Sequence, residues 1–226
     1  MKNAYAFHAF LVSICLAALL TPPALAVDPA PTPPWVAPVP ANAEWTITLS
    51  SPAAGAKPPP SATLQTIHVI KTGTTKHDTM TYSNGTTEEA WYVGKNAFLT
   101  DTFSKANIYL TEFSAYDFGG LGDPVHSLGF TGFDWVKAGN YDTIGSYQNE
   151  RCYHYRFQGQ QQAEAWIQVK DKMPVAYQIS GILYVYSFAA PPSTPLALPP
   201  AYQAIWDQSL LIQKRQALFQ QDLGKH

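Results

Sequence analysis

The spacing of the histidine residues decides whether this chain offers the ligands of a metal site. Four histidines lie in the body of the chain, but neither a His-x-His pair nor a His-Glu-x-x-His motif occurs. A zinc site needs such ligands at close spacing. We therefore predict no metal site and no cofactor; the nearest candidates are His77, which precedes Asp78, and His154, which lies between two tyrosines. The four histidines are His68, His77, His126 and His154.

Aspartates and glycines are concentrated in residues 114–139, the segment that interrupts the strand pattern of the central domain. Paired carboxylates can hydrolyse glycosides or bind calcium, but the spacing here matches neither motif. Asp and Gly also shape turns, which is the simpler interpretation. No Gly-x-Ser-x-Gly turn for a serine nucleophile occurs anywhere in the chain. We therefore predict a protein that is not an enzyme, with a hydrolase as the alternative, using Asp117, Asp123, Asp134 and Asp142.

Aromatic side chains offer a binding surface that needs no polar motif. An acyl chain buried against them would gain about 0.8 kcal/mol per methylene. The same side chains would serve equally well as an ordinary core. The residues that we predict to contact an apolar ligand, in the concave face of a sheet or in the glycine-rich loop, are Trp91, Trp135, Trp166, Phe118, Phe130 and Phe133.

The first 26 residues have the pattern of a secretory signal. A lone cation at Lys2 precedes an apolar stretch, and Ala24-Leu25-Ala26 has the small-x-small form of a cleavage site. We therefore expect export, to the periplasm or to the extracellular medium. Cys15 lies inside this signal, so Cys152 is the single cysteine of the expected mature chain, either packed as a small apolar residue or reactive.

Prolines divide the remaining chain. Ten of the 19 prolines lie between Pro29 and Pro60, and such runs favour extended conformations that cannot form a ladder. We predict a proline-rich arm at residues 27–43, a β domain at residues 44–190, and a proline-rich connector with a C-terminal amphipathic helix at residues 191–226. The apolar stripe of that helix should include Tyr202, Ile205, Ile212, Phe219 and Leu223, and should pack on the domain's own sheet or on a membrane or protein partner.

Short alternating or apolar runs separated by turns fill the central domain, which is typical of antiparallel strands. Asn84-Gly85 is the strongest hairpin signal, because both residues tolerate positive φ. The connections are too short for parallel pairing, so a meander is expected. The predicted strands are residues 44–50, 64–71, 76–83, 86–93, 97–103, 108–113, 143–148, 152–157, 163–169, 175–180 and 183–188.

The formal net charge of −2 gives no reason to expect nucleic acid or an anionic lipid surface as the main partner. A transient contact with a membrane surface remains compatible with the terminal helix. The identity of any protein partner is left open by the sequence.

Several segments together resemble exported proteins of the periplasmic lipoprotein-carrier superfamily. They are Gly132-Phe133-Asp134-Trp135-Val136, residues 141–147, Arg151-Cys152-Tyr153 and, above all, residues 163–175, where a Trp-Ile strand is followed by a turn and Pro174-Val175. Gln168 stands where an Asp is common in that superfamily. The resemblance covers roughly residues 64–186.

This resemblance implies a strongly bent antiparallel sheet, an unclosed half barrel whose apolar concave face is covered by helices or loops. It also implies the carriage of acyl chains or lipoproteins, although no ligand-contacting residue can be transferred. We therefore predict a mainly β fold of about ten strands with a C-terminal helix, and a protein that binds an apolar ligand. The alternative is an envelope scaffold that uses its proline-rich arm and terminal helix.

Overall fold

The computed structural model of the chain describes residues 30–50, 62–100, 108–112, 133–159 and 162–223. Its contacts divide the chain into Met1–Ala30 and Pro31–His226, and the description below concerns the second unit. The predicted signal at residues 1–26 lies outside the described residues.

Eleven antiparallel strands form one sheet, which confirms the predicted mainly β fold and nearly matches the predicted strand number. Each strand lies within three residues of a run chosen from the alternation pattern, and the described part also contains a 3-10 turn, η2 (Ala138–Asn140). The strands are β1 (Asn42–Ser50), β2 (Leu64–Thr72), β3 (Thr75–Tyr82), β4 (Thr87–Val93), β5 (Asn96–Thr100), β6 (Ile108–Glu112), β7 (Tyr141–Tyr147), β8 (Glu150–Gln158), β9 (Gln162–Gln168), β10 (Pro174–Ile179) and β11 (Ile182–Ala189).

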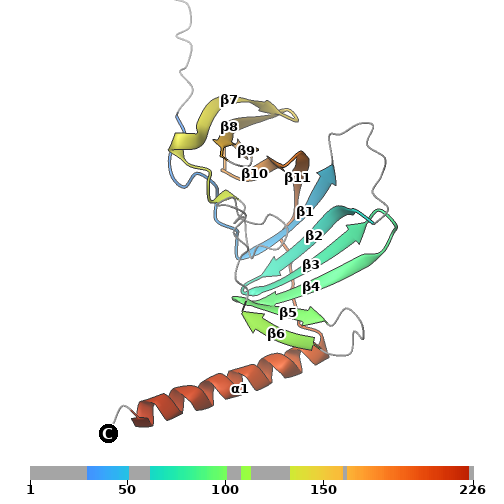
Figure 1. Ribbon diagram of the computed structural model, residues 1–226, viewed down its shortest axis with the longest axis vertical. Coiled ribbons are helices and arrows are strands. Elements are labelled where there is room, and N and C mark those ends of the chain that lie inside the picture. The colour runs from blue at the N-terminus through green and yellow to red at the C-terminus, as the bar shows by residue number, and fades with distance from the viewer. Residues whose placement is uncertain (1–29, 51–61, 101–107, 113–132, 160–161, 224–226) are drawn as a thin grey trace, which may run out of the picture. The chain divides into compact units, whose positions relative to one another are not determined.

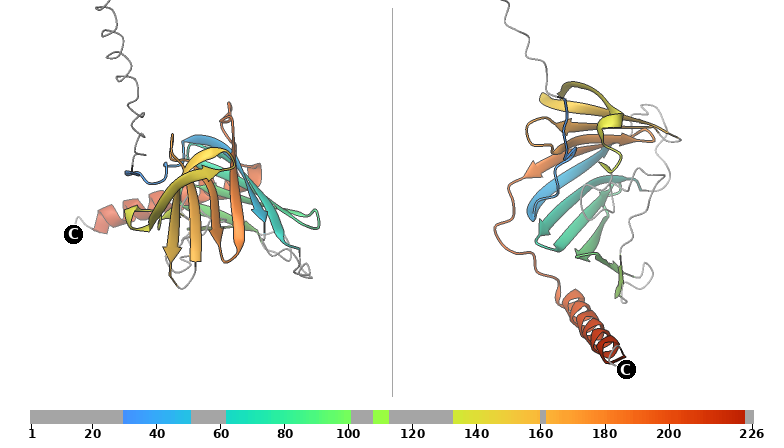
Figure 2. Two further views of the ribbon diagram at one scale, coloured as in Figure 1. Left: turned by 90° about the horizontal axis from the view of Figure 1, so that it is seen from above. Right: turned by 90° about the vertical axis from the view of Figure 1, so that its left-hand side faces the viewer.

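Two meanders meet in the middle of this sheet (Figures 1 and 2). The strand order is β6-β5-β4-β3-β2-β1-β11-β10-β9-β8-β7, so every neighbouring pair is a hairpin except β1 with β11. That pair joins the first strand to the last, with Trp45 opposite Phe188 and Ile47 opposite Tyr186. The meander was predicted correctly, whereas this long-range pairing was not foreseen. The predicted strong bend is not tested by the strand order and stays a prediction.

Hairpin turns have the predicted chemistry. Gly85 has φ +81° in the turn between β3 and β4, and its N–H donates to the carbonyl of Tyr82 over 2.9 Å. The turn between β7 and β8 consists of Gln148 and Asn149, with φ +50° and +68°. Positive φ at both central positions is the geometry of a type I′ turn, which matches the twist of the flanking strands.

The sheet has two differently covered faces, because side chains alternate along each strand. We call inner face the face that carries Trp45, Val69 and Tyr177, and outer face the opposite one. The inner face carries the main core. Across the sheet, this core extends from β3 through β2, β1, β11, β10 and β9 to β8. Its buried members are Ala43, Trp45, Ile47, Ile67, Val69, Met80, Phe133, Trp135, Val136, Tyr153, Tyr155, Ala163, Ala165, Ile167, Tyr177, Tyr184 and Tyr186.

Irregular segments cover part of this inner core. Phe133, Trp135 and Val136, which precede η2, are each only 3% exposed. From the proline-rich arm, Trp35, Val36 and Val39 pack against the same core. The N–H of Ala37 donates to the carbonyl of Lys172 over 2.8 Å, which anchors the arm next to the turn before β10. The arm is therefore part of the folded unit from at least residue 35.

The helix α1 (Pro200–Leu223) has the predicted position and packs on the outer face near the β6 edge. Its side chains Tyr202, Ile205 and Trp206 lie on a second cluster of Trp91, Val93 and Phe98, together with Leu196 and Leu198 of the connector. The N–H of Leu196 donates to the hydroxyl of Thr72 over 2.7 Å. The first turns of the helix thus contact the protein's own sheet, which is one of the alternatives that the sequence left open for the stripe.

Candidate functional site

An aromatic centre occupies the inner face between β8 and β11. The register places Tyr177 opposite Ala165 and opposite Tyr184, and Tyr155 also lies opposite Ala165. Alanine on β9 thus leaves room for the large rings on both neighbouring strands. Phe133 contacts Tyr177 edge-on, with 5.3 Å between ring centroids. The same phenyl ring lies 5.7 Å from the ring of Tyr186, so this segment is held by aromatic contacts.

Tyr155 carries one of the buried hydroxyl groups of this aromatic centre. Tyr155 is 0% exposed, and its Oη has no hydrogen-bond partner among the residues that the structure describes. Burial raises the pKa of Tyr155, and the neighbouring Tyr153 and Tyr141 raise it further. A buried hydroxyl without a partner costs about 1–3 kcal/mol.

A buried ion pair marks the inner face of β3 and β4. Lys76 Nζ lies 2.9 Å from Asp78 Oδ2, and both side chains are at most 4% exposed. The ammonium group also lies 4.5 Å from the ring centroid of Tyr92. Charges at this depth need partners of this kind, because desolvation of an isolated ion is costly. The inner face thus has an aromatic region and a charged region.

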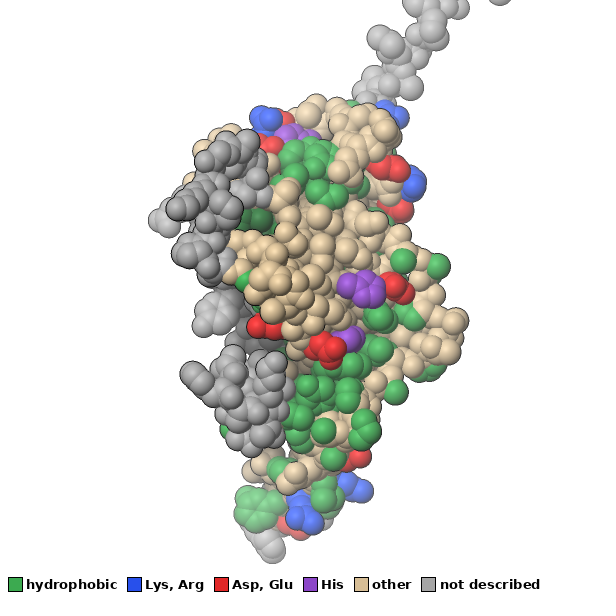
Figure 3. Space-filling view, turned by 90° about the vertical axis from the view of Figure 1, so that its right-hand side faces the viewer, with side chains coloured by type: hydrophobic (Ala, Val, Ile, Leu, Met, Phe, Trp, Pro, Cys, Tyr) green, Lys and Arg blue, Asp and Glu red, His purple; other side chains and the backbone are tan. Residues whose placement is uncertain are grey.

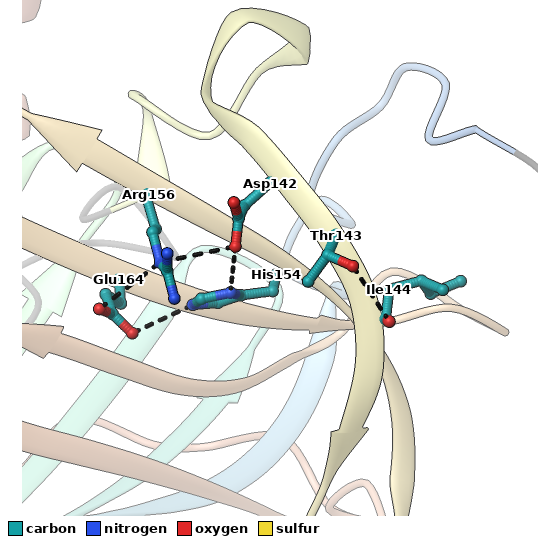
Figure 4. A network of polar contacts seen from close by, with 6 residues as sticks. All are labelled: Asp142, Thr143, Ile144, His154, Arg156 and Glu164. Atoms are coloured by element: carbon teal, nitrogen blue, oxygen red, sulfur yellow. Dashed lines mark hydrogen bonds and ion pairs between the residues drawn. The ribbon is translucent and has the colours of Figure 1, made fainter.

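A polar network crosses β7, β8 and β9 on the outer face (Figure 4). His154 Nδ1 lies 3.1 Å from Asp142 Oδ2, and His154 Nε2 lies 3.1 Å from Glu164 Oε2. Arg156 Nε lies 3.5 Å from the same Asp142 oxygen and 3.7 Å from Glu164 Oε1. The register brings Arg156 opposite Glu164, and an irregularity between Tyr141 and Thr143 admits Asp142.

This network joins three neighbouring strands, because His154 on β8 contacts Asp142 on β7 and Glu164 on β9. With both nitrogens directed at carboxylates, the ring has no nitrogen left to serve as a general base for another group. The ring of His154 also stacks on Trp166, with 4.9 Å between centroids.

The other described histidines also pair with carboxylates on the outer face. His68 Nε2 lies 3.0 Å from Glu44 Oε1, and His77 Nε2 lies 3.4 Å from Glu89 Oε2. Figure 3 shows histidine side chains beside acidic ones on one face of the molecule, with a hydrophobic patch nearby. Within the described ranges, no three His, Cys, Asp or Glu side chains gather in a group that could hold a metal ion.

The six predicted ligand-contacting residues fall into three groups. Phe133 and Trp135 lie together in the inner core. Trp91 and Trp166 lie on the outer face, the first under α1 and the second on His154. Phe118 and Phe130 lie outside the described residues.

The six predicted ligand-contacting residues did not include the tyrosines of the aromatic centre, of which Tyr155 and Tyr177 are fully buried. Their alternation with polar residues was visible in the sequence, but the face on which they lie depends on the register. Of the four aspartates considered for hydrolysis, Asp142 belongs to the outer network, and Asp117 and Asp123 lie outside the described residues. Asp134, in the segment that covers the inner core, is exposed.

Cys152 is packed within β8, on the side of the sheet that carries Tyr147 and Trp166. It is 1% exposed, and the rings of Tyr147 and Trp166 lie 4.8 Å apart on the same face. Burial raises the pKa of the Cys152 thiol to about 11, and the charge of Glu150 acts in the same direction. The thiolate is the reactive form, so this environment favours the interpretation as a small packed residue.

The described structure defines a mainly β protein with one eleven-stranded antiparallel sheet and one C-terminal α-helix. Among the described helices, none combines the length and the apolar character needed to cross a bilayer.

No protein-family model matches the chain, and no curated protein matches it. Among solved structures, the lipoprotein LppX of Mycobacterium tuberculosis aligns with 70% of this chain and 90% of its own chain, at 8% sequence identity and a TM-score of 0.33.

Proposed function

We propose that this protein is an exported, non-enzymatic binding protein that holds an apolar ligand, such as an acyl chain, against the inner face of its sheet. The observation that carries the proposal is the apolar and aromatic core on the inner face, which runs from Met80 of β3 across β2, β1, β11, β10 and β9 to Tyr153 and Tyr155 of β8. Its described cover consists of short irregular segments around residues 35–39 and 133–136, which can be displaced at less cost than a packed second sheet. The Tyr155 hydroxyl supplies one hydrogen bond for a polar end of the ligand.

The environments of His154 and Cys152, two residue types that often act in catalysis, support binding rather than catalysis. Both nitrogens of His154 face carboxylates, and the thiol of Cys152 has a raised pKa. A hydrophobic ligand site needs mainly apolar area and a few polar groups, and the aromatic centre with Tyr155 provides both. The resemblance to the periplasmic lipoprotein-carrier superfamily, read from residues 163–175, points to the same class of ligand.

The test is the binding of a fluorescent fatty acid to the purified protein, combined with mass spectrometry of lipids that copurify with it. Tyr177→Ala should weaken binding of the probe at least tenfold, because it removes a ring that belongs to the inner face of the sheet itself. Trp166→Ala is the matched control, since Trp166 lies on the outer face and its loss should leave the affinity unchanged. Equal effects of the two variants, or no binding to the unmodified protein, would contradict the proposal.

The alternative function, an envelope scaffold, is favoured by one observation on α1. Six large apolar side chains between Leu210 and Leu223 are 44–63% exposed, which is unusual for a helix that packs only within its own chain. The predicted arm fits this role less well, because Trp35 and Val39 already pack on the inner core.

A further inference from the structure

The part of α1 beyond its first turns projects no side chain into the protein's own core. Tyr202, Ile205 and Trp206 contact the outer cluster, but every residue from Leu210 to Leu223 is exposed. A helix of this kind gains most of its stability from burial of an apolar face. Something other than the sheet of the same chain should therefore cover this segment.

The exposed segment continues the stripe that docks on the sheet. Ile212 and Phe219 follow Ile205 at intervals of seven residues, and Leu223 follows Phe219 at an interval of four. A step of seven residues is close to two helical turns, and a step of four is close to one. These side chains therefore lie along one side of the helix, as at the seam of paired helices. Ile212, Phe219 and Leu223 are 48%, 63% and 56% exposed.

The charge of the segment argues for a neutral partner. Lys214 and Arg215 are balanced by Asp207 and Asp222, and α1 contains six glutamines, so the helix carries no net charge. A helix that binds anionic lipid typically presents a strongly basic polar face. A second neutral amphipathic helix with complementary charges fits better, and another copy of this chain supplies one.

We propose that α1 pairs antiparallel with α1 of a second copy of this chain. The docked first turns leave residues 209–223 for the overlap, and antiparallel packing places the two sheets at opposite ends of it. In one such register Ile212 faces Leu223 of the second copy, and Phe219 faces Gln216 of the second copy. Arg215 then lies near Asp222 of the second copy, whose carboxylate can accept from more than one donor. Antiparallel helix dipoles also attract one another.

The first test measures molar mass in solution by light scattering and by sedimentation of the purified protein. The expected mass is twice that of one chain, with dissociation on dilution. Ile212→Gln combined with Phe219→Gln should weaken association at least tenfold, because both apolar side chains leave the seam while helix propensity is kept. The matched control is Leu211→Gln combined with Leu218→Gln, which removes apolar residues of similar exposure from another side of the helix and should leave association unchanged.

The second test exchanges charges. Arg215→Asp alone should weaken the dimer, because it brings two carboxylates together across the interface. Asp222→Arg in the same chain should restore association, which neither a lipid surface nor an unrelated partner would produce. A monomer at 100 micromolar, equal effects of the two glutamine pairs, absence of rescue, or binding of α1 to anionic vesicles without self-association would each overturn the proposal.

Discussion

At the scale of single residues, burial determines what the polar groups of this protein can do. Within the described part of the chain, Tyr155 Oη is buried without a hydrogen-bond partner, Lys76 is buried beside Asp78, and Cys152 is 1% exposed. The free-energy cost of burial differs among the three groups. A buried charge needs an oppositely charged or hydrogen-bonding partner more than a buried hydroxyl or thiol does.

The first residue-scale prediction concerns Tyr155. Tyr155→Phe should leave the free energy of unfolding unchanged or raise it by about 1 kcal/mol, because it removes a buried hydroxyl without a partner. Urea unfolding measures the change. Tyr82→Phe is the control, since the Tyr82 hydroxyl donates to Glu88 over 2.7 Å and its loss should cost up to about 1 kcal/mol. A clear loss of stability in Tyr155→Phe would show that the hydroxyl has a partner in solution.

The second residue-scale prediction concerns the pH dependence of stability. The pKa of Cys152 rises from an ordinary value of 9.0 to about 11 on folding, so the folded protein holds the thiol proton more tightly than the unfolded chain. Above pH 9 the unfolded chain therefore binds fewer protons, and stability should fall between pH 9 and pH 11. Cys152→Ala should make this decline shallower. An unchanged slope, or rapid alkylation of native Cys152 at pH 8, would contradict the buried-thiol interpretation.

At the scale of elements, turn geometry and the outer network hold β7 at the edge of the sheet. The β7–β8 turn uses Gln148 and Asn149 at positive φ, where glycine and asparagine are favoured. Across the same strands, Asp142 and Glu164 enclose His154 and Arg156. The two contacts of the half-exposed Arg156 contribute little individually, whereas His154 is buried between its two carboxylate partners.

The element-scale prediction concerns substitutions that stabilise the β7–β8 turn. Gln148→Asn together with Asn149→Gly should raise the free energy of unfolding by about 0.5–1 kcal/mol, because Asn-Gly relieves the cost of positive φ. Thermal unfolding would show the gain. Asn84→Ala in the β3–β4 turn, where Asn-Gly is already present, should instead lower stability. A loss in the first variant would mean that the Gln148 side chain contributes more than its backbone strain costs.

At the scale of the whole molecule, the two faces of the sheet pack against different segments of the chain. The inner face contains the main core, and the outer face near β6 receives the connector and the first turns of α1. The remaining length of α1 adds little to the folding of a single chain, since its side chains are exposed.

The whole-molecule prediction is a pair of truncations. Removal of residues 210–226 should change the urea midpoint little at submicromolar protein concentration, because no core contact is lost. Removal of residues 200–226 should lower it clearly, since Trp91 and Phe98 lose the cover of Tyr202, Ile205 and Trp206. Circular dichroism would follow both transitions. Similar midpoints for the two truncated proteins would contradict the role assigned to the first turns of the helix.

The sequence by itself determined the local structure. Alternation of apolar and polar residues placed all eleven strands, Asn84-Gly85 marked a tight hairpin, and the stripe from Tyr202 to Leu223 predicted α1. These features depend on residues that are near one another in the chain, so a local pattern is sufficient to predict them. The sequence also identified six aromatic residues as candidates for ligand contact, but it did not show which of them lie together in the fold.

The tertiary structure alone decided which faces and partners these elements share. The pairing of β1 with β11, the meeting of Tyr155 and Tyr177 beside Ala165, and the network around His154 all join residues that are distant in the chain. A shift of one residue in register would move each side chain to the opposite face. Trp135 and Trp166 looked equivalent as aromatic residues, and only the register and the packing of residues 133–136 placed them on opposite sides of the sheet.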